Sequence, residues 1–171
     1  MNTLDRSPTP VSSALSALMG VVVLAASGPY ATLAAGLAAL GLVVLLAGLF
    51  VGTHRLTTSG CSGLFVGAVA GGIEGAPILV TLVGVTGAVL AWDFAGYAID
   101  LGVQLGHDAD ATRLELVHAT GSVVVGTGVG GVGFLVYLAA TGGQPVSAVF
   151  AFLLAAVFLL AALRHLDPVV S

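Results

Sequence analysis

The sequence contains no lysine, and its permanently basic side chains are four arginines, at positions 6, 55, 113 and 164. Charged residues make up only 7% of the chain, whereas a soluble globular domain carries about 25%. A protein surface that faces water needs more charged side chains than this. We therefore expect most of the protein surface to face lipid. The net charge of -4 comes without the clustered basic surface that nucleic-acid binding requires, which excludes that class of function.

Cysteine is almost absent as well. Cys61 is the only one, which excludes an intramolecular disulfide, a CxxC redox pair and a cysteine-based zinc cluster. Because Cys61 lies in an apolar stretch, we interpret it as a small packing residue. The chain also has no GxSxG nucleophile motif, and we expect neither an enzyme active site nor a cofactor.

Long uncharged runs predict helices that cross a bilayer. Residues 7–53 contain no Asp, Glu, Lys or Arg, and a single helix of that length would be about 70 Å long, against a hydrocarbon core of about 30 Å. The run must therefore fold back, and Ser27-Gly28-Pro29 is the obvious break, because proline cannot continue a helix. The same argument divides residues 119–163 at the turn 141–145.

These breaks predict an all-α fold, a polytopic transmembrane helix bundle that forms one integral membrane domain over residues 1–171. The runs lack the alternation of a membrane barrel, and helices satisfy the backbone within lipid. The third helix is short and rich in glycine in this interpretation, and Arg55 belongs to a polar link before it. Six helices are expected, at about 11–26, 30–51, 57–73, 77–104, 112–140 and 146–163.

Six spans place all four arginines on one side, together with both termini. By the positive-inside rule this side is the cytoplasm, and the chain is a multi-pass protein of the cell membrane. The first helix, preceded by Arg6, has some features of a cleaved signal peptide. Asp5 dilutes the basic region, so we expect the helix to be retained; cleavage would leave five spans in the same orientation.

Two glycine motifs lie within predicted helices. Gly63, Gly67 and Gly71 share one helix face and allow a second backbone to approach, either within the bundle or in a homodimer. Residues 126–131 match GxGxxG, but they lie in an uncharged stretch of a predicted helix, without the βαβ unit that nucleotide binding needs. We therefore expect these glycines to allow close packing or to loosen the helix locally.

Asp93 is the most informative residue, because an acid placed in the inner third of the bilayer is costly and suggests function. The spacing of Asp93, Tyr97, Asp100 and Gln104 puts them on one helix face, as a polar stripe that runs toward the cytoplasm. The simplest interpretation is an interhelical hydrogen-bond clamp. A proton or ion path and a partner or ligand site are the alternatives.

Glu115 and His118 begin the next helix. Thr112 and Glu115 have the spacing of a capping box. Glu115-x-x-His118 is also half of a di-iron site, but such a site needs a second ExxH and two further glutamates, so we expect no metal. His118 is instead expected to hydrogen-bond Asp93 or Asp100 across antiparallel helices, while His54 is expected to be a simple interfacial residue.

The central block also carries a resemblance. A Trp92-Asp93 pair is followed by Gly102-x-Gln-Leu-Gly and then by Arg113-x-Glu-Leu-Val-His-Ala, with a Gly-Gly-Gln-Pro turn later in the chain. In this order these elements resemble a haloarchaeal membrane protein family of unknown function. His107 stands where a basic residue such as arginine is usual in that family. The resemblance marks four candidate functional residues: Asp93, Asp100, Glu115 and His118.

The resemblance also implies a partner. Genes of that family often lie beside genes for a MoxR-type ATPase, which implies an accessory membrane subunit of such a system. Our first hypothesis is accordingly a non-enzymatic accessory or scaffold subunit whose contact is the polar linker at 106–111. The second hypothesis is a small transporter or proton-coupled channel that uses Asp93 and His118. The oligomeric state stays open.

Overall fold

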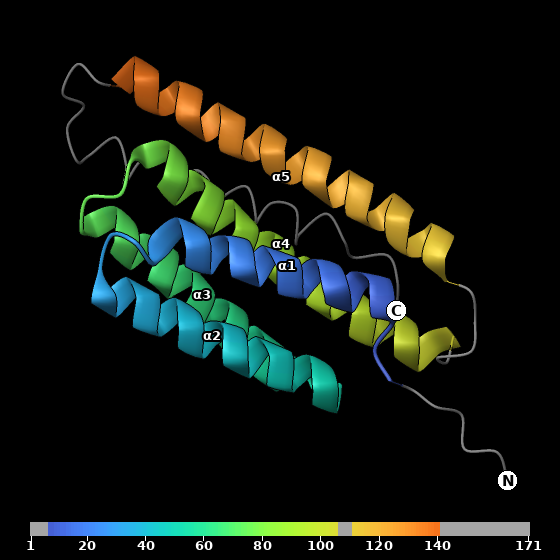
Figure 1. The fold of residues 1–171 in the computed structure, drawn as a ribbon. Coiled ribbons are helices and arrows are strands. Elements are labelled where there is room, and N and C mark those ends of the chain that lie inside the picture. Colours follow the sequence, from blue (N-terminus) through green and yellow to red (C-terminus); the bar gives the residue numbers. More distant parts are fainter. Residues whose placement is uncertain (1–6, 106–110, 141–171) are drawn as a thin grey trace, which may run out of the picture. The chain divides into compact units, whose positions relative to one another are not determined.

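A computed structural model describes residues 7–105 and 111–140 of the chain, and this described part is all-helical (Figure 1). All five of its helices are long and apolar enough to cross a membrane. The chain divides into two compact units, residues 1–134 and 135–171, and the packing below concerns the first. The helices are α1 (Pro10–Ser27), α2 (Thr32–Val51), α3 (His54–Ile73), α4 (Ile78–Leu105) and α5 (Thr112–Ala140).

The all-helical class and the first five predicted helices are confirmed, with ends that differ by at most three residues. The predicted break at Ser27-Gly28-Pro29 is present, since α1 ends at Ser27 and α2 begins at Thr32. The predicted turn at 141–145 lies outside the described residues. The predicted sixth helix, 146–163, lies outside the described residues. The number of spans and the sides of the termini therefore stay predictions.

The prediction for the third helix was wrong at its start. It begins at His54, so Arg55 lies in its first turn rather than in a link, and its 20 residues equal the length of α2. The connection needs only two residues because Gly52 adopts a left-handed conformation with φ of 68°, which glycine tolerates. A polar first turn fits a helix end at a membrane edge, where Arg55 can extend toward water.

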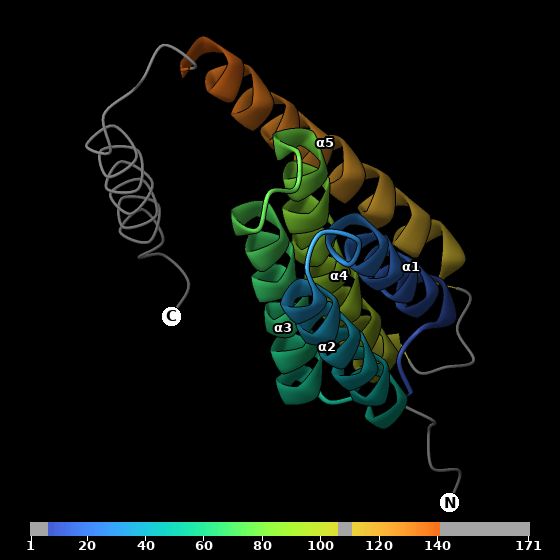
Figure 2. The ribbon, with the colours of Figure 1, turned by 60° about the vertical axis from the view of Figure 1, so that its left-hand side comes forward.

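Small residues hold α1 to α4 together. Helix α2 packs closely against α3, α1 packs against α4, and α3 also contacts α4 (Figure 2). Backbones approach closely where glycines face each other: a Cβ at Gly60 would overlap the backbone of Leu45 and of Gly41. The buried core consists largely of alanine and aliphatic side chains: Val23, Ala38, Leu45, Leu49, Cys61, Leu64, Ala68, Ala88, Ala91 and Ala95.

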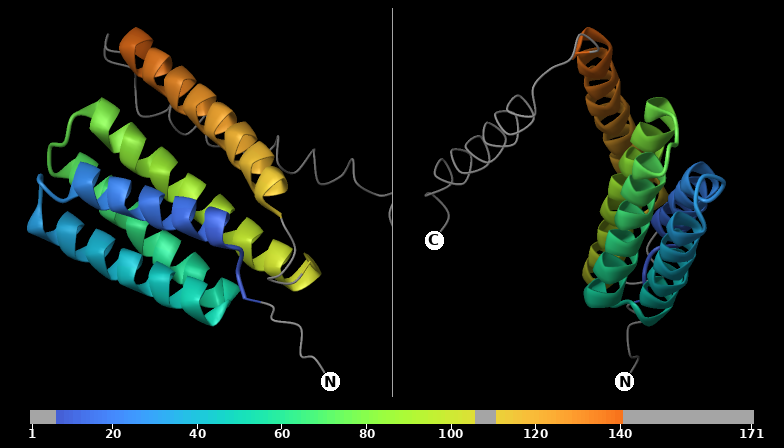
Figure 3. Two further views of the ribbon diagram at one scale, coloured as in Figure 1. Left: turned by 45° about the vertical axis from the view of Figure 1, so that its right-hand side comes forward. Right: turned by 90° about the vertical axis from the view of Figure 1, so that its left-hand side faces the viewer.

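Helix α5 is attached differently. It runs along α4 (Figure 3), but its backbone approaches no other described helix as closely as α2 approaches α3 or α1 approaches α4. Side chains bridge the space, since Leu90 and Thr86 of α4 reach the positions of Gly126 and Gly130. No residue is buried in the most apolar 18-residue window of α5. The outer face of α5 is therefore available to lipid or to a partner.

The antiparallel order brings several helix ends together. Helices α1, α3 and α5 begin at the end of the bundle where α2 and α4 finish. Arg55 lies in the first turn of α3 and Arg113 in the first turn of α5, and both are exposed. We call this end of the bundle the arginine end.

Candidate functional site

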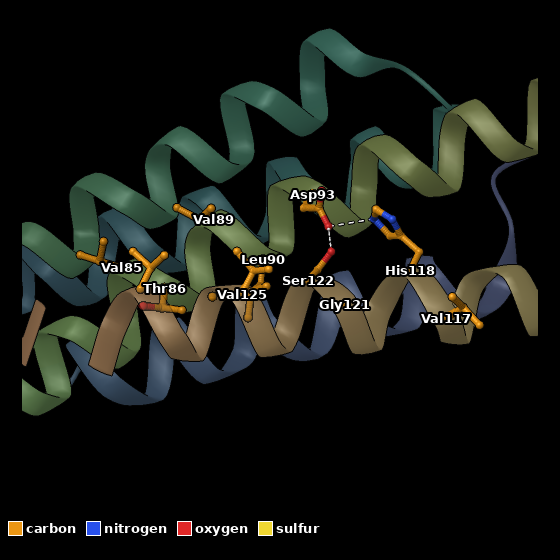
Figure 4. Close-up of a pocket in the computed structure, with 12 residues that line it drawn as sticks. Val85, Thr86, Val89, Leu90, Asp93, Val117, His118, Gly121, Ser122 and Val125 are labelled. Carbon is orange, nitrogen blue, oxygen red and sulfur yellow. Dashed lines mark hydrogen bonds and ion pairs between the residues drawn. The ribbon is translucent and has the colours of Figure 1, made fainter. Parts of the chain in front are cut away.

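Asp93 is the centre of a polar cluster between α4 and α5 (Figure 4). Its Oδ2 atom accepts a hydrogen bond of 2.6 Å from the Ser122 hydroxyl and lies 2.9 Å from His118 Nε2. The Tyr97 ring stacks on the His118 imidazole, with 3.8 Å between centroids and 7° between planes. His118 thus bonds Asp93, the first of the two acids that the sequence indicated.

Helical periodicity explains why these groups meet. Tyr97 lies one turn after Asp93 on α4, and Ser122 lies one turn after His118 on α5, so each helix presents two polar side chains to the other. With Asp93 ionised, the Nε2–H tautomer of His118 donates to it, and this proton assignment follows from the hydrogen-bond partners. The Ser122 hydroxyl and the imidazole therefore share one acceptor.

The cluster is not fully enclosed. The Asp93 side chain is 40% exposed and that of His118 is 29% exposed. Both line a groove of about 570 Å³ whose other walls are mostly aliphatic. The groove residues are Val85, Thr86, Val89, Leu90 and Asp93 of α4 with Val117, His118, Gly121, Ser122, Val125, Gly126 and Val129 of α5.

Asp100 belongs to a separate contact at the arginine end. Its Oδ1 lies 3.1 Å from Nε2 of His54, the first residue of α3, and both side chains are more than half exposed. The stripe expected from spacing is therefore divided between two neighbours, because Asp93 and Tyr97 face α5 while Asp100 faces α3. Gln104 is exposed near the end of α4.

Glu115 has a different role from the one its sequence motif suggested. It is 1% exposed, and its Oε2 accepts hydrogen bonds from the Thr9 hydroxyl, at 2.9 Å, and from the Ser12 backbone N–H. Thr9 is the N-cap of α1, so a carboxylate of α5 caps α1, where the helix dipole favours negative charge.

The expected capping box on α5 itself is not formed. The backbone N–H of Glu115 bonds the Ala111 carbonyl, which makes Ala111 the N-cap residue and places Thr112 inside the first turn. Glu115 is then too far along the helix to reach back to the N-cap. Glu115 and His118, the two residues of the ExxH pattern, have partners on different helices.

The segment before α1 is fixed by the same region. The Thr9 backbone N–H donates to the Ala98 carbonyl of α4 at 3.0 Å. A Cβ at Gly102 would overlap the carbonyl of Ser7, so glycine is required where this segment crosses α4. Residues 7–9 thus lie against α4, with Glu115 of α5 bonded to Thr9 at the start of α1.

The residues of the predicted glycine motif face other helices of the same chain. Gly63 faces Gly41 of α2, and Gly67 faces Ala38 of α2. Gly71 faces Ser27 at the end of α1. In the second motif, Gly126 and Gly130 face α4, while a Cβ at Gly128 or Gly131 would meet nothing within 4 Å.

Comparison with known families gives the lineage. A family described as a family of unknown function, DUF7519, matches residues 6–160, which is most of the chain. The chain belongs to the DUF7519 family. No curated protein and no solved structure matches it.

Three contacts of this DUF7519 chain were not anticipated from its sequence. The His54–Asp100 pair had a usable signal, because a histidine that begins one helix and an acid near the end of the next meet when the helices are antiparallel. Ser122 follows His118 by four residues and so shares its helix face, but its bond to Asp93 was not foreseen. The cap that Glu115 provides for α1 joins helices far apart in sequence, and no local pattern indicates it.

Proposed function

We propose that this chain is a non-enzymatic integral membrane protein of the cell membrane, an accessory or scaffold subunit that contacts its assembly through the arginine end. The observation that carries the proposal is the placement of Arg55 and Arg113. Both are exposed at that end, and within residues 7–105 and 111–140 neither forms an ion pair with a carboxylate. Exposed guanidinium groups favour an acidic partner surface by electrostatic complementarity.

The orientation proposed is the one that the arginines favour. By the positive-inside rule the arginine end faces the cytoplasm. In the full proposal, six helices cross the membrane and both termini are cytoplasmic. A cytoplasmic MoxR-type ATPase, the gene neighbour implied by the family resemblance, is the partner to be tested.

The arrangement of the polar cluster supports a non-enzymatic role. In a nucleophilic triad the serine donates to the histidine, which then takes the serine proton. Here Ser122 and His118 both bond the same Asp93 oxygen, so the imidazole is not hydrogen-bonded to the hydroxyl that it would have to activate. This geometry holds two helices together and does not prepare a nucleophile.

Co-purification with the ATPase tests the scaffold proposal. Tagged protein is purified from native membranes in mild detergent, and the MoxR-type ATPase is quantified with a specific antibody. An Arg55→Gln/Arg113→Gln variant should retain less than a tenth of the wild-type signal. Arg55→Lys/Arg113→Lys, which keeps the charge, and Glu74→Gln at the opposite end should retain most of it.

Two results would contradict the scaffold proposal. One is wild-type protein that elutes without the ATPase from membranes that contain it. The other is equal recovery with the neutral and the charge-conserving variants, because charge at the arginine end would then be irrelevant.

A second candidate function, proton-coupled transport, is favoured by the exposure of Asp93 to the groove. A carboxylate at membrane depth that is bonded through one oxygen and open at the other can exchange a proton. Proteoliposomes that contain a pH-sensitive dye should acidify under an imposed potential, and Asp93→Asn should abolish this flux. Asp100→Asn is the control. Wild-type protein without flux above protein-free vesicles would exclude this function.

A further inference from the structure

We infer that the groove between α4 and α5 binds a lipid alcohol, a molecule with a long apolar chain that ends in a hydroxyl group. The inference is independent of both proposed functions, because it concerns equilibrium binding and neither partner recruitment nor flux. It rests on the distribution of polar and apolar residues along the groove and on the hydrogen-bonding atoms that the cluster leaves open.

The groove has one polar end. Along α4 its lining begins at Val85 and finishes at Asp93, and along α5 it begins at Val117 and finishes at Val129. At 1.5 Å per residue these stretches are about 12 Å and about 18 Å long. Asp93, His118 and Ser122 lie near the end closest to the arginine end, and the remaining length is aliphatic apart from Thr86. This distribution of groove residues suits a ligand with a long apolar chain and one polar end.

The size and the openness of the groove agree with this class of ligand. A volume of about 570 Å³ falls within the range of about 300–1,000 Å³ that is usual for small-molecule sites. Val89, Val117, Val125 and Val129 are 51–68% exposed, so the groove is open along its length. A molecule dissolved in the bilayer can enter it sideways.

The open atoms of the cluster accept hydrogen bonds. His118 uses Nε2 and Asp93 uses Oδ2. Within the described part of the chain, His118 Nδ1 and Asp93 Oδ1 have no hydrogen-bond partner. In the Nε2–H tautomer, Nδ1 carries a lone pair, and Oδ1 of a carboxylate accepts as well. The matching head group is therefore a donor, as a hydroxyl group is.

Other head groups fit less well. No arginine lines the groove, so a phosphate would bring a second negative charge to Asp93 without a counter-charge. A cationic head group would compete with His118 for Asp93. A neutral hydroxyl adds no charge, and its O–H would donate a hydrogen bond to a carboxylate that is otherwise costly to expose to hydrocarbon.

Photolabelling of the full chain in phosphatidylcholine nanodiscs tests this inference. The probe is a geranylgeraniol analogue with a diazirine in its chain and a terminal alkyne, and its matched control is the methyl ether of the same probe. Label should appear in the peptide that spans residues 117–129, and unlabelled geranylgeraniol should compete for it. The ether cannot donate, and the loss of one hydrogen bond should weaken its binding by about tenfold.

Three variants locate the site. Val125→Trp fills the groove from an exposed position and should abolish labelling while the helical circular dichroism signal is retained. Asp93→Leu/His118→Leu should bind the alcohol and the ether equally, since both open acceptors are gone. Asp100→Asn, outside the groove, should label like the wild type.

Several outcomes would overturn the inference. Equal labelling by alcohol and ether in the wild type would mean that the head group is not recognised. Labelling that survives Val125→Trp would place the probe elsewhere. In a Cys61→Ala/Val125→Cys variant, disulfide-linked dimers that form at high yield would show that a second copy of the chain occupies the groove.

Discussion

Glu115 shows how one buried carboxylate joins two helices that are distant in the sequence. Its Oε2 accepts hydrogen bonds from Thr9 and Ser12 at the start of α1. Glu115→Ala would leave the Ser12 N–H and the Thr9 hydroxyl without their acceptor. We expect the free energy of unfolding in detergent to fall by about 1–3 kcal/mol, measured by denaturant titration followed by circular dichroism. Glu74→Ala, at an exposed acid, should leave this free energy unchanged, and equal losses in the two variants would refute the assignment.

The Asp93–His118 contact predicts a measurable coupling energy. A double-mutant cycle with Asp93→Asn and His118→Gln should give about 1 kcal/mol, the upper part of the range for polar contacts in membrane proteins. The His54–Asp100 pair serves as the control cycle, because its side chains are 53% and 61% exposed. It should give a smaller coupling energy. Additive effects of Asp93→Asn and His118→Gln would show that the clamp contributes nothing to folding.

At the residue scale, the sequence indicated the Asp93–His118 contact between neighbouring antiparallel helices. Asp93 and His118 stand on consecutive helices at matching depth, so their meeting follows from the topology. The partner of Glu115 depends on where the start of α1 lies against α4 and α5, which is a result of packing between helices that are not adjacent in sequence. Spacing along α5 carries no information about it.

At the scale of the element, glycine position decides how closely two helices approach. The sequence pattern emphasised Gly63, Gly67 and Gly71, yet the closest approach is at Gly60, where a Cβ would overlap backbone atoms of α2. Backbone cannot move aside as a side chain can. Gly60→Ala should therefore separate α2 from α3 and lower the free energy of unfolding by about 1–3 kcal/mol in the same titration.

Gly36 provides a control for Gly60 on the partner helix. A Cβ at Gly36 would meet nothing within 4 Å. Because alanine is the better helix former, Gly36→Ala should leave stability unchanged or raise it slightly. If Gly60→Ala were as stable as Gly36→Ala, close backbone packing would not be what holds α2 to α3.

Helix ends were predictable wherever a strong breaker interrupts an uncharged run. Pro29, in the break predicted at 27–29, lies within a few residues of the end of α1 and of the start of α2. The start of α3 was not predicted, because charge was taken as a sign of a link. A left-handed Gly52 makes the connection so short that His54 and Arg55 are already helical. Charge marks the membrane edge but not the helix boundary.

At the scale of the whole molecule, the described charges divide the bundle into two unlike ends. Arg55, Asp100, Arg113 and Glu115 lie at or near the arginine end, and Glu74 lies in the turn at the other end. The sequence predicted this separation from charge-free runs alone. The assignment of the arginine end to the cytoplasm rests on the positive-inside rule, which describes how helices insert and not how they pack. The orientation therefore needs a measurement on intact cells.

Cysteine labelling supplies that measurement, since Cys61 is the only native cysteine and is buried. In a Cys61→Ala background, Glu74→Cys should react with a membrane-impermeant maleimide on intact cells. Arg55→Cys should react only after the membrane is opened, because we expect the arginine end to lie inside. Labelling of both variants in detergent controls for side chains that are merely inaccessible. If Arg55→Cys reacts on intact cells and Glu74→Cys does not, the orientation is the opposite of the one proposed. The arginine end would then lie outside the cytoplasm, and the scaffold proposal would lose the cytoplasmic contact on which it depends.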